Sequence, residues 1–308
     1  LTATGTNNVD LDYCHQNNIK VCNVRDYSSD TVAQHTLALL LHLIEKNNYY
    51  DHYVKSKQYG KDGMFSHFTN VFHDVSSMTW GIVGLGNIGK KVASIATSMG
   101  AKVQYYSTSG ANNDAIYQQV DFDTLLKTSD IITIHAPYNE KTAYLFNEEA
   151  LLKMKQDAYL INVGRGGIIE EKALIKVLNN GHLAGVGLDV FEHEPLLEND
   201  PLYTIKDLDK VIFTPHVAWG SLESRQRCVN EVIKKSSAIF IAIDTPYLME
   251  ENGRYNEEKN QVSLIYNFLK ENIDEVKEKL ILLVPLKCEV YFHSGRMDEV
   301  NKKVRKTY

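Results

Sequence analysis

The stretch "WGIVGLGNIGKKVA", residues 80–93, decides the fold class of this chain. It begins as a short apolar strand and continues as a helix, with Gly84, Gly86 and Gly89 in the spacing GxGxxG at the junction. Such glycines allow a tight turn, a close approach of the backbone to a pyrophosphate, and close packing of the helix on the strand. The unpaired N–H groups of the helix N-terminus would then face the phosphates. The stretch predicts a dinucleotide-binding turn, and a glycine-rich turn without a ligand is the alternative.

Five further apolar runs with strand character follow, separated by helical patterns. They are "KVQYY" (102–106), "IITIH" (131–135), "AYLINV" (158–163), "AGVGLDV" (184–190) and "VIFTP" (211–215). Two of the intervening helices are expected to end at Gly100 and Gly181, because glycine is favoured just beyond a helix C-terminus. The alternation predicts an α/β fold with a doubly wound parallel sheet of the Rossmann type.

The segments on either side of this block are also predicted to be helical. A long helix from about residue 30 to 55, capped by Ser29 or Asp30, is apolar on nearly every side between Leu37 and Ile44. Such a helix must be buried all round, so we expect it between domains or between subunits, and we expect a homodimer. Ser221 can cap a helix with one apolar stripe: Val229, Val232, Ile233, Phe240 and Ile243. A separate amphipathic helix is expected at Val262, Ile265, Leu269, Ile273, Val276 and Leu280.

Composition excludes several classes of partner. The net charge is -6, and neither Lys nor Arg forms a long stripe, which argues against nucleic acid or an anionic membrane as the main partner. The longest apolar runs, residues 37–41 and 280–286, are too short to cross a bilayer. The four cysteines are scattered without the spacing of a metal site, so we expect reduced thiols, a cytoplasmic location and no bound metal.

The choice of nicotinamide cofactor stays open at this stage. The second predicted strand is followed by Ser107, where an Asp or Glu that binds the ribose hydroxyls is expected. Without a carboxylate nothing repels a 2′-phosphate, yet the loop contains no Arg or Lys to attract one. The sequence therefore allows NAD or NADP, with NAD slightly favoured.

Three groups of polar side chains are predicted to meet at the carboxyl edge of the sheet, where open α/β sheets bind their ligands. Arg165 follows the fourth predicted strand and His216 the sixth, while Asp189, Glu192, His193 and Glu194 follow the fifth. An Arg can bridge a ketone oxygen and a carboxylate, a His can transfer a proton, and a Glu can stabilise the charged His. These residue types together suit a small 2-oxo acid as substrate.

Other residues compete for these roles. His193 is adjacent to Glu194 and is the alternative acid/base, although sequence neighbours in an extended loop point apart. We expect Glu192 and His193 to be solvated loop neighbours, and His135 to be a wall of the cofactor pocket or a structural group. His35 and His42 are expected to be core or interface groups. Arg165 could instead pair with a structural carboxylate, but its flanking glycines favour a ligand.

With these residues in place, the sequence resembles the D-isomer-specific 2-hydroxyacid dehydrogenases. The segments that carry the resemblance stand in that family's order over about residues 2–250: "VAQHTLALLL", "GIVGLGNIG", "IHAPYNEKTAYLFNEEAL", "LINVGRGGIIEEKAL", "GLDVFEHEPL" and "TPHVAWGS". The ending "HVAWGS" is most similar to the glycerate dehydrogenase and hydroxypyruvate reductase branch.

The resemblance implies a role for each site residue. Arg165 would orient the substrate, Glu194 would be the partner carboxylate, and His216 would be the acid/base. Asp189 would lie near the nicotinamide, and the backbone N–H groups of Thr4 and Gly5 would hold the substrate carboxylate. Trp219 would either pack or form a wall of the substrate pocket. Further cofactor contacts are expected at Asn87, Ile88, Ser107, His135, Pro137, Thr142, Val163, His216 and Gly220.

The resemblance also implies a division into domains. Residues 1–72 would be part of a smaller, flavodoxin-like substrate domain, 73–217 the dinucleotide-binding domain, 218–250 the return to the substrate domain, and 251–308 an extension without an assigned role. Because Leu1 stands just before the expected substrate loop, we expect the substrate domain to be incomplete at its N-terminus.

Three functions are compatible with these sequence features. The first is the NAD(P)H-dependent reduction of a small 2-oxo acid such as hydroxypyruvate or glyoxylate. The second is a non-catalytic nicotinamide-binding regulatory protein of the same fold. The third is a truncated chain that binds the cofactor without turnover.

Overall fold

The computed structural model describes residues 3–6, 9–110, 114–235, 238–244, 270 and 280–286. The chain divides into two compact units, one from Ala3 to Gln226 and one from Arg227 to Tyr308. The predicted domains 1–72 and 73–217 both lie within the first unit, and the boundary between them stays a prediction.

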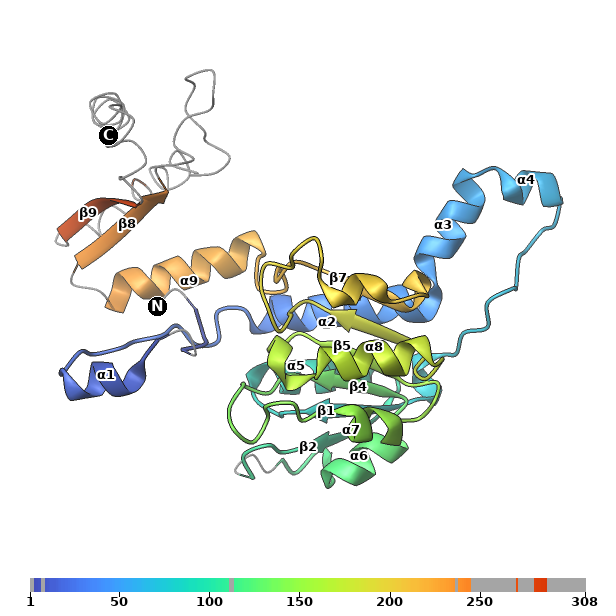
Figure 1. Cartoon of the computed structure of the whole chain (residues 1–308), viewed down its shortest axis with the longest axis horizontal. Coiled ribbons are helices and arrows are strands. Elements are labelled where there is room, and N and C mark those ends of the chain that lie inside the picture. Colours follow the sequence, from blue (N-terminus) through green and yellow to red (C-terminus); the bar gives the residue numbers. More distant parts are fainter. Residues whose placement is uncertain are drawn as a thin grey trace, which may run out of the picture. The chain divides into compact units, whose positions relative to one another are not determined.

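A seven-stranded parallel sheet forms the centre of the first unit (Figure 1). Its strand order is β3-β2-β1-β4-β5-β6-β7, so the direction of strand addition reverses on either side of β1. The six predicted strands are confirmed, whereas β3 was missed because its two glutamines carry no apolar pattern. The strands are β1 (Thr79–Val83), β2 (Lys102–Tyr106), β3 (Gln118–Gln119), β4 (Ile131–Ile134), β5 (Tyr159–Asn162), β6 (Gly185–Leu188) and β7 (Val211–Phe213).

Helices cover the sheet with two separate apolar cores. One core includes residues of α2 and α5, and the other includes residues of α6, α7 and α8. Gly100 (φ +87°) and Gly181 (φ +81°) follow α5 and α8 in the left-handed conformation, as predicted. The helices are α2 (Ser29–Glu45), α5 (Asn87–Ser98), α6 (Phe122–Thr128), α7 (Glu148–Lys153) and α8 (Glu171–Asn179), and short 3₁₀ turns are Val75–Ser77, Gly166–Ile168, Pro201–Thr204 and Leu208–Lys210.

The long helix predicted for residues 30–55 is interrupted. Lys46 adopts the left-handed conformation (φ 51°), which ends α2 and begins α3 (Asn47–Lys55). The apolar pattern did not reveal this break because the break depends on the backbone of one residue. The N-cap position is Ser28, one residue before the predicted cap.

Helix α2 packs directly on β6 because two glycines of that strand present no side chain. A Cβ on Gly185 would lie 3.2 Å from Leu43 Cδ2, and one on Gly187 would lie 3.2 Å from Leu39 Cβ. Leu39 and Leu43 are one helical turn apart and are both buried. Leu37 and Leu41 are only partly buried, so the helix is not enclosed on every side within this chain.

Helices α3 and α4 (Gln58–Asp62) extend away from the sheet, and residues 63–74 return to it (Figure 1). The ring of His67 stacks on that of Tyr53 at a centroid distance of 4.0 Å, which ties the returning segment to α3. A short helix, α1 (Leu11–Gln16), precedes α2 in the chain and is capped by Asp10.

The second unit contains a two-stranded parallel sheet. Helix α9 (Leu222–Lys235) leads to β8 (Ala238–Asp244), which pairs with β9 (Leu280–Leu286). The predicted helical stripe was therefore wrong at Phe240 and Ile243, and Leu280 also lies in a strand rather than in a helix. The run "AIFIAID" is rich in β-branched and aromatic residues, which favour a strand. The helix predicted at residues 262–276 lies outside the described residues, apart from the helical residue Lys270.

No helix of the described ranges has the length and apolar character needed to span a bilayer. The described cysteines Cys14 and Cys228 are free thiols, as predicted, and Cys288 lies outside the described residues.

Replacing Gly187 by Val should destabilise the protein by about 1–3 kcal/mol, because added carbons would overpack the contact between α2 and β6. The new Cβ alone would lie 2.9 Å from Ile161 Cδ1. Urea unfolding followed by circular dichroism measures the loss. Gly60→Ala is the control: Gly60 lies within α4, and an added Cβ would have nothing within 4 Å, so this change should be neutral or stabilising. Equal stability of the two variants would contradict the packing argument.

Candidate active site at the carboxyl edge of the sheet

The glycine-rich turn after β1 has the geometry expected of a phosphate-binding turn. Gly84 has φ +89°, and a Cβ there would lie 2.9 Å from Ala136 Cα. A Cβ on Gly89 would overlap the carbonyl oxygen of Gly84, so α5 and β1 could not pack as closely. Gly86 faces open space and forms the N-cap of α5 without a side-chain cap. The first N–H groups of α5 therefore have room to bind an anion.

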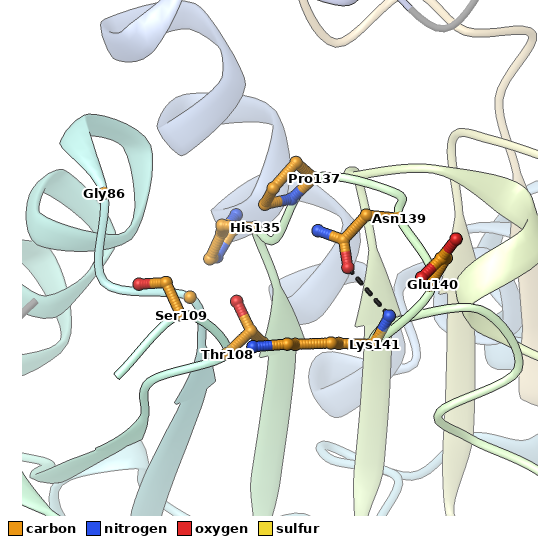
Figure 2. Close-up of a pocket in the computed structure, with 9 residues that line it drawn as sticks. Gly86, Thr108, Ser109, His135, Pro137, Asn139, Glu140 and Lys141 are labelled. Carbon is orange, nitrogen blue, oxygen red and sulfur yellow. Dashed lines mark hydrogen bonds between the residues drawn. The ribbon is translucent and has the colours of Figure 1, made fainter. Parts of the chain in front are cut away.

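A pocket of about 520 Å³ opens beside this turn (Figure 2). It lies at the carboxyl ends of β1, β2 and β4, where the strand order reverses. Four of the predicted cofactor residues, Gly84, Gly86, His135 and Pro137, line it. The remaining lining residues are Thr108, Ser109, Asn139, Glu140 and Lys141.

His135 is partly buried and contributes its ring to the wall of the pocket. Burial lowers its pKa from 6.5 to about 3, so the ring is neutral at physiological pH. Its Nε2 lies 3.0 Å from Thr133 Oγ1, while its buried Nδ1 has no partner among the described residues. A buried polar atom without a partner is costly, so Nδ1 fits a contact with a bound ligand. The uncapped helix, the open Gly86 and this nitrogen together fit a dinucleotide.

Thr142 shapes the pocket from behind. It is fully buried, and its hydroxyl donates to the carbonyl of Pro137 (2.7 Å) and accepts from the backbone N–H of Asn139 (2.8 Å). These bonds fix the loop that carries Asn139, Glu140 and Lys141. A direct contact of Thr142 with the cofactor stays a prediction, as do the contacts expected of Asn87, Ile88, Ser107, Val163 and Gly220.

His216 and Glu194 form a direct pair across the ends of β6 and β7. His216 Nδ1 lies 2.7 Å from Glu194 Oε2. A carboxylate can only accept, so Nδ1 is the donor and Nε2 is left to exchange a proton with a ligand. The backbone holds both residues, because Phe191 N–H donates to Glu194 (2.9 Å) and His216 N–H donates to the Asp189 carbonyl (2.8 Å).

Arg165 stands at the end of β5, next to β6 in the sheet. Its guanidinium donates to the carbonyl of Gly164 at 2.7 Å, and its own carbonyl accepts from Asn162 Nδ2 at 2.9 Å. A Cβ on Gly166 would overlap the backbone of Phe191. The turn that carries Arg165 therefore touches the loop that carries Glu194.

Asp189 holds the loop of His216 in place. Its carboxylate is fully buried and accepts from the backbone N–H groups of Val217 and Ala218, both at 2.9 Å, and from Thr214 Oγ1 at 2.6 Å. His35 of α2 lies 3.5 Å from the same carboxylate. We predicted Asp189 near the nicotinamide; the structure gives its carboxylate a positioning role, and a cofactor contact stays a prediction.

Glu192 is not the solvated neighbour that we predicted. Its carboxylate accepts from the backbone N–H of Glu171 (2.7 Å), and its own N–H donates to the Glu171 carboxylate (2.8 Å). Burial raises the pKa of Glu171 from 4.5 to about 7, and it outweighs the bond from Glu192 N–H, which lowers that pKa. The reciprocal pair ties the start of α8 to the 191–194 loop. His193, in contrast, is exposed as predicted.

The other predicted substrate residues, Thr4, Gly5 and Trp219, lie outside the loops described above. Thr4 Oγ1 donates to the carbonyl of Val24 at 3.1 Å, which holds residues 3–6 beside the segment before α2. The ring of Trp219 meets that of Tyr27 edge to face at 6.3 Å. These contacts establish packing for Thr4 and Trp219, and their contact with a substrate, like that of Gly5, stays a prediction.

Sequence reasoning missed Lys141 and Glu171. Lys141 carried no signal because it belongs to a different loop from the predicted ribose-binding residues. Glu171 had a weak signal, since acidic residues are favoured at the start of a helix, but its bond to Glu192 depends on the fold.

The fold and the site define a Rossmann-type α/β protein that joins a dinucleotide pocket to a histidine–carboxylate pair. A family model described as "D-isomer specific 2-hydroxyacid dehydrogenase, NAD binding domain" matches residues 37–218. The chain belongs to this family of NAD(P)-dependent oxidoreductases.

Named relatives agree with this assignment. The glycerate dehydrogenase of Methylorubrum extorquens is 35% identical over 242 residues, which cover 79% of this chain and 75% of the relative. The glyoxylate reductase of Thermococcus litoralis is 34% identical over 248 residues, covering 79% and 73%.

Solved structures share the fold. D-lactate dehydrogenase from Aquifex aeolicus, complexed with NAD and lactic acid, has a TM-score of 0.67 and 27% identity, covering 90% of this chain and 78% of that one. An acyclic imino acid reductase in complex with NADPH and D-Arg has a TM-score of 0.67 and 32% identity, covering 76% and 72%.

Glu171→Gln should become more stable relative to the unmodified protein as the pH rises. Because the folded-state pKa of Glu171 is raised to about 7, its contribution to stability is present below pH 4.5 and is lost as the pH rises through 7. Gln cannot ionise, so the relative gain between about pH 5 and about pH 8 should reach up to about 3 kcal/mol.

Urea unfolding at the two pH values measures this difference. The exposed Glu223 provides the control, since Glu223→Gln should follow the unmodified protein at both pH values. Parallel pH profiles for Glu171→Gln and the unmodified protein would contradict the burial argument.

Proposed function

We propose that the chain reduces a small 2-oxo acid, such as hydroxypyruvate or glyoxylate, to the D-2-hydroxy acid with NADH or NADPH. The hydrogen bond of 2.7 Å between His216 and Glu194, at the carboxyl edge of a nucleotide-binding sheet, carries this proposal. The similarity to a glycerate dehydrogenase and to glyoxylate reductases supports the substrate class.

The residues of the pocket would hold the cofactor. The N–H groups at the start of α5, with room provided by Gly86, would bind the pyrophosphate, and His135 Nδ1 would meet a polar group of the ligand. When bound, the reduced nicotinamide supplies the hydride that C2 of the substrate accepts.

The chain's own residues would bind the substrate and move the proton. Arg165 has a fork of donors that can hold the substrate carboxylate and the ketone oxygen. His216 donates the proton on Nε2 to the ketone oxygen as negative charge develops there. Glu194 keeps Nδ1 as the other donor and stabilises the positive charge of the ring while Nε2 is protonated.

Replacing His216 by Ala should lower kcat for hydroxypyruvate or glyoxylate by about 10²- to 10⁴-fold, the usual contribution of a placed proton donor. Glu194→Gln should cause a smaller loss, about 10- to 100-fold, because the amide can donate to Nδ1 and favour the wrong tautomer. Oxidation of NADH or NADPH, followed by absorbance, measures both.

The exposed His193 provides the matched control, and His193→Ala should retain nearly full activity. Rapid turnover by His216→Ala would reject the assignment. Cofactor binding without turnover in the unmodified chain would instead favour a regulatory protein or a truncated, inactive chain. Comparison with a chain that carries an added N-terminal segment separates these two.

We further propose that residues 73–217 form the dinucleotide-binding domain, and that residues 1–72 and 218–250 belong to a substrate domain. The cytoplasmic location expected from the scattered cysteines is also a proposal. Neither depends on the assignment of the catalytic pair.

A homodimer that uses the segment around α2 and α3 is part of the proposal. The segment that returns from α4 is apolar at Met64, Phe65, Phe68 and Val71, and Phe65 is 95% exposed. Exposed apolar side chains of this density are typical of protein interfaces.

The unmodified protein should sediment as a dimer at micromolar concentration, and a double variant, Phe65→Ser with Phe68→Ser, should shift toward the monomer while keeping its circular dichroism spectrum. Burial of two aromatic side chains supplies much of the energy of a small interface. Ile116→Ser, at a residue 82% exposed elsewhere on the unit, should leave the dimer intact. A monomeric profile of the unmodified protein would contradict the proposal.

A further inference from the structure

The loop after β4 brings a lysine to the end of β2. Lys141 lines the same pocket as Thr108 and Ser109, which follow β2 in the sequence. Figure 2 shows the Lys141 side chain crossing the pocket, with its amino end pointing toward Thr108. The positive charge that the loop after β2 lacks is therefore supplied by another segment.

The charge of Lys141 is available for a ligand. No ion pair of Lys141 is found within the described ranges, whereas the nearby Lys90 is paired with Asp114 at 3.2 Å. Glu140 also lines the pocket, but its side chain points away from Lys141 and Thr108 (Figure 2). The loop that carries Lys141 is held by Thr142 and by the bond from Lys141 N–H to Asn139 Oδ1 (2.9 Å).

Ser107 follows β2 at the position where NAD-specific Rossmann domains have an Asp or Glu. Ser107 is nearly buried, and its hydroxyl has no partner among the described residues. A carboxylate at this position would accept bonds from both ribose hydroxyls and would repel a phosphate on either. Ser107, Thr108 and Ser109 carry no negative charge, so they do not repel a phosphate on the ribose.

We propose that Lys141, with the hydroxyl groups of Thr108 and Ser109, binds the 2′-phosphate of NADP, so that this chain prefers NADP to NAD. This inference rests on the nucleotide-binding function proposed above. An ammonium group with two hydroxyl donors suits a phosphate monoester dianion. The slight preference for NAD drawn from the sequence is thereby reversed.

An alternative position for Lys141 is beside the pyrophosphate, which NAD and NADP share. The two positions predict different ligand selectivity, because only a contact to the 2′-phosphate distinguishes the two cofactors. Fragments of the cofactor separate the positions without any need for turnover.

The test measures binding of three adenosine nucleotides to the full chain by isothermal titration calorimetry. The ligands are 5′-AMP, 2′,5′-ADP, and the isomer 3′,5′-ADP, which has the same charge with its phosphate on the other ribose hydroxyl. The protein should bind 2′,5′-ADP about tenfold more tightly than either of the others, because each charge-assisted hydrogen bond contributes about that factor.

Lys141→Met should abolish this selectivity and leave the affinity for 5′-AMP unchanged. Lys141→Arg should retain it, since the positive charge and the donors remain. The control is Lys172→Met, because Lys172 is an exposed lysine of α8 that does not line the pocket. In the complete reaction, Lys141→Met should raise KM for NADPH by about tenfold with kcat unchanged.

Equal affinity of the unmodified protein for 2′,5′-ADP and 3′,5′-ADP would overturn the proposal. Loss of affinity for all three ligands in Lys141→Met would place Lys141 at the 5′-phosphate and would also overturn it. If none of the three binds to the unmodified protein, the nucleotide-binding function itself fails. If 5′-AMP binds without selectivity for the 2′-phosphate, only the present inference fails.

Discussion

Close backbone contact between successive strand-end turns is the constraint on which the site depends. The turn after β1 meets the segment after β4 at Ala136, because Gly84 has no side chain. The turn after β5 meets the same residue from the other side, where a Cβ on Gly164 would lie 3.0 Å from the Ala136 carbonyl oxygen. Gly166 then touches the backbone of Phe191. These contacts run along the edge of the sheet from the phosphate turn to the loop of Glu194.

Backbone contacts of this kind fix geometry better than contacts between flexible side chains, since they leave no rotamers to adjust. The contact between Asp189 and the loop of His216, at the far end of this edge, is made by hydrogen bonds instead. Asp189 accepts from the N–H groups of Val217 and Ala218, which sets the position of the preceding His216 in its left-handed conformation (φ 53°). The pocket beside the glycine-rich turn and the His216–Glu194 pair are thus parts of one continuous edge, although they lie on different strands.

Most of the fold could be predicted from the sequence because its signals are local. The glycine spacing at 84–89, the apolar strands and the glycines after α5 and α8 each depend on a few neighbouring residues. The break at Lys46 and the strand at Ala238–Asp244 were missed, since a single left-handed residue leaves the apolar pattern intact and a β-branched run can extend a helical stripe.

The residues of the site also fall into those that the sequence could predict and those that it could not. The placement of Arg165, Glu194 and His216 could be predicted because carboxyl ends of parallel strands share one edge, and the structure joins Glu194 to His216 directly. Their roles in catalysis stay predictions. Lys141 and Glu171 could not, because the fold brings each beside a distant segment: Lys141 lines the pocket with Thr108, and Glu171 bonds to Glu192. The cluster of three carboxylates between residues 189 and 194 is tolerated for a related reason. Asp189 and Glu192 accept backbone N–H groups from distant segments, and Glu194 accepts one from Phe191 in its own loop, so the fold compensates charges that the sequence alone leaves crowded.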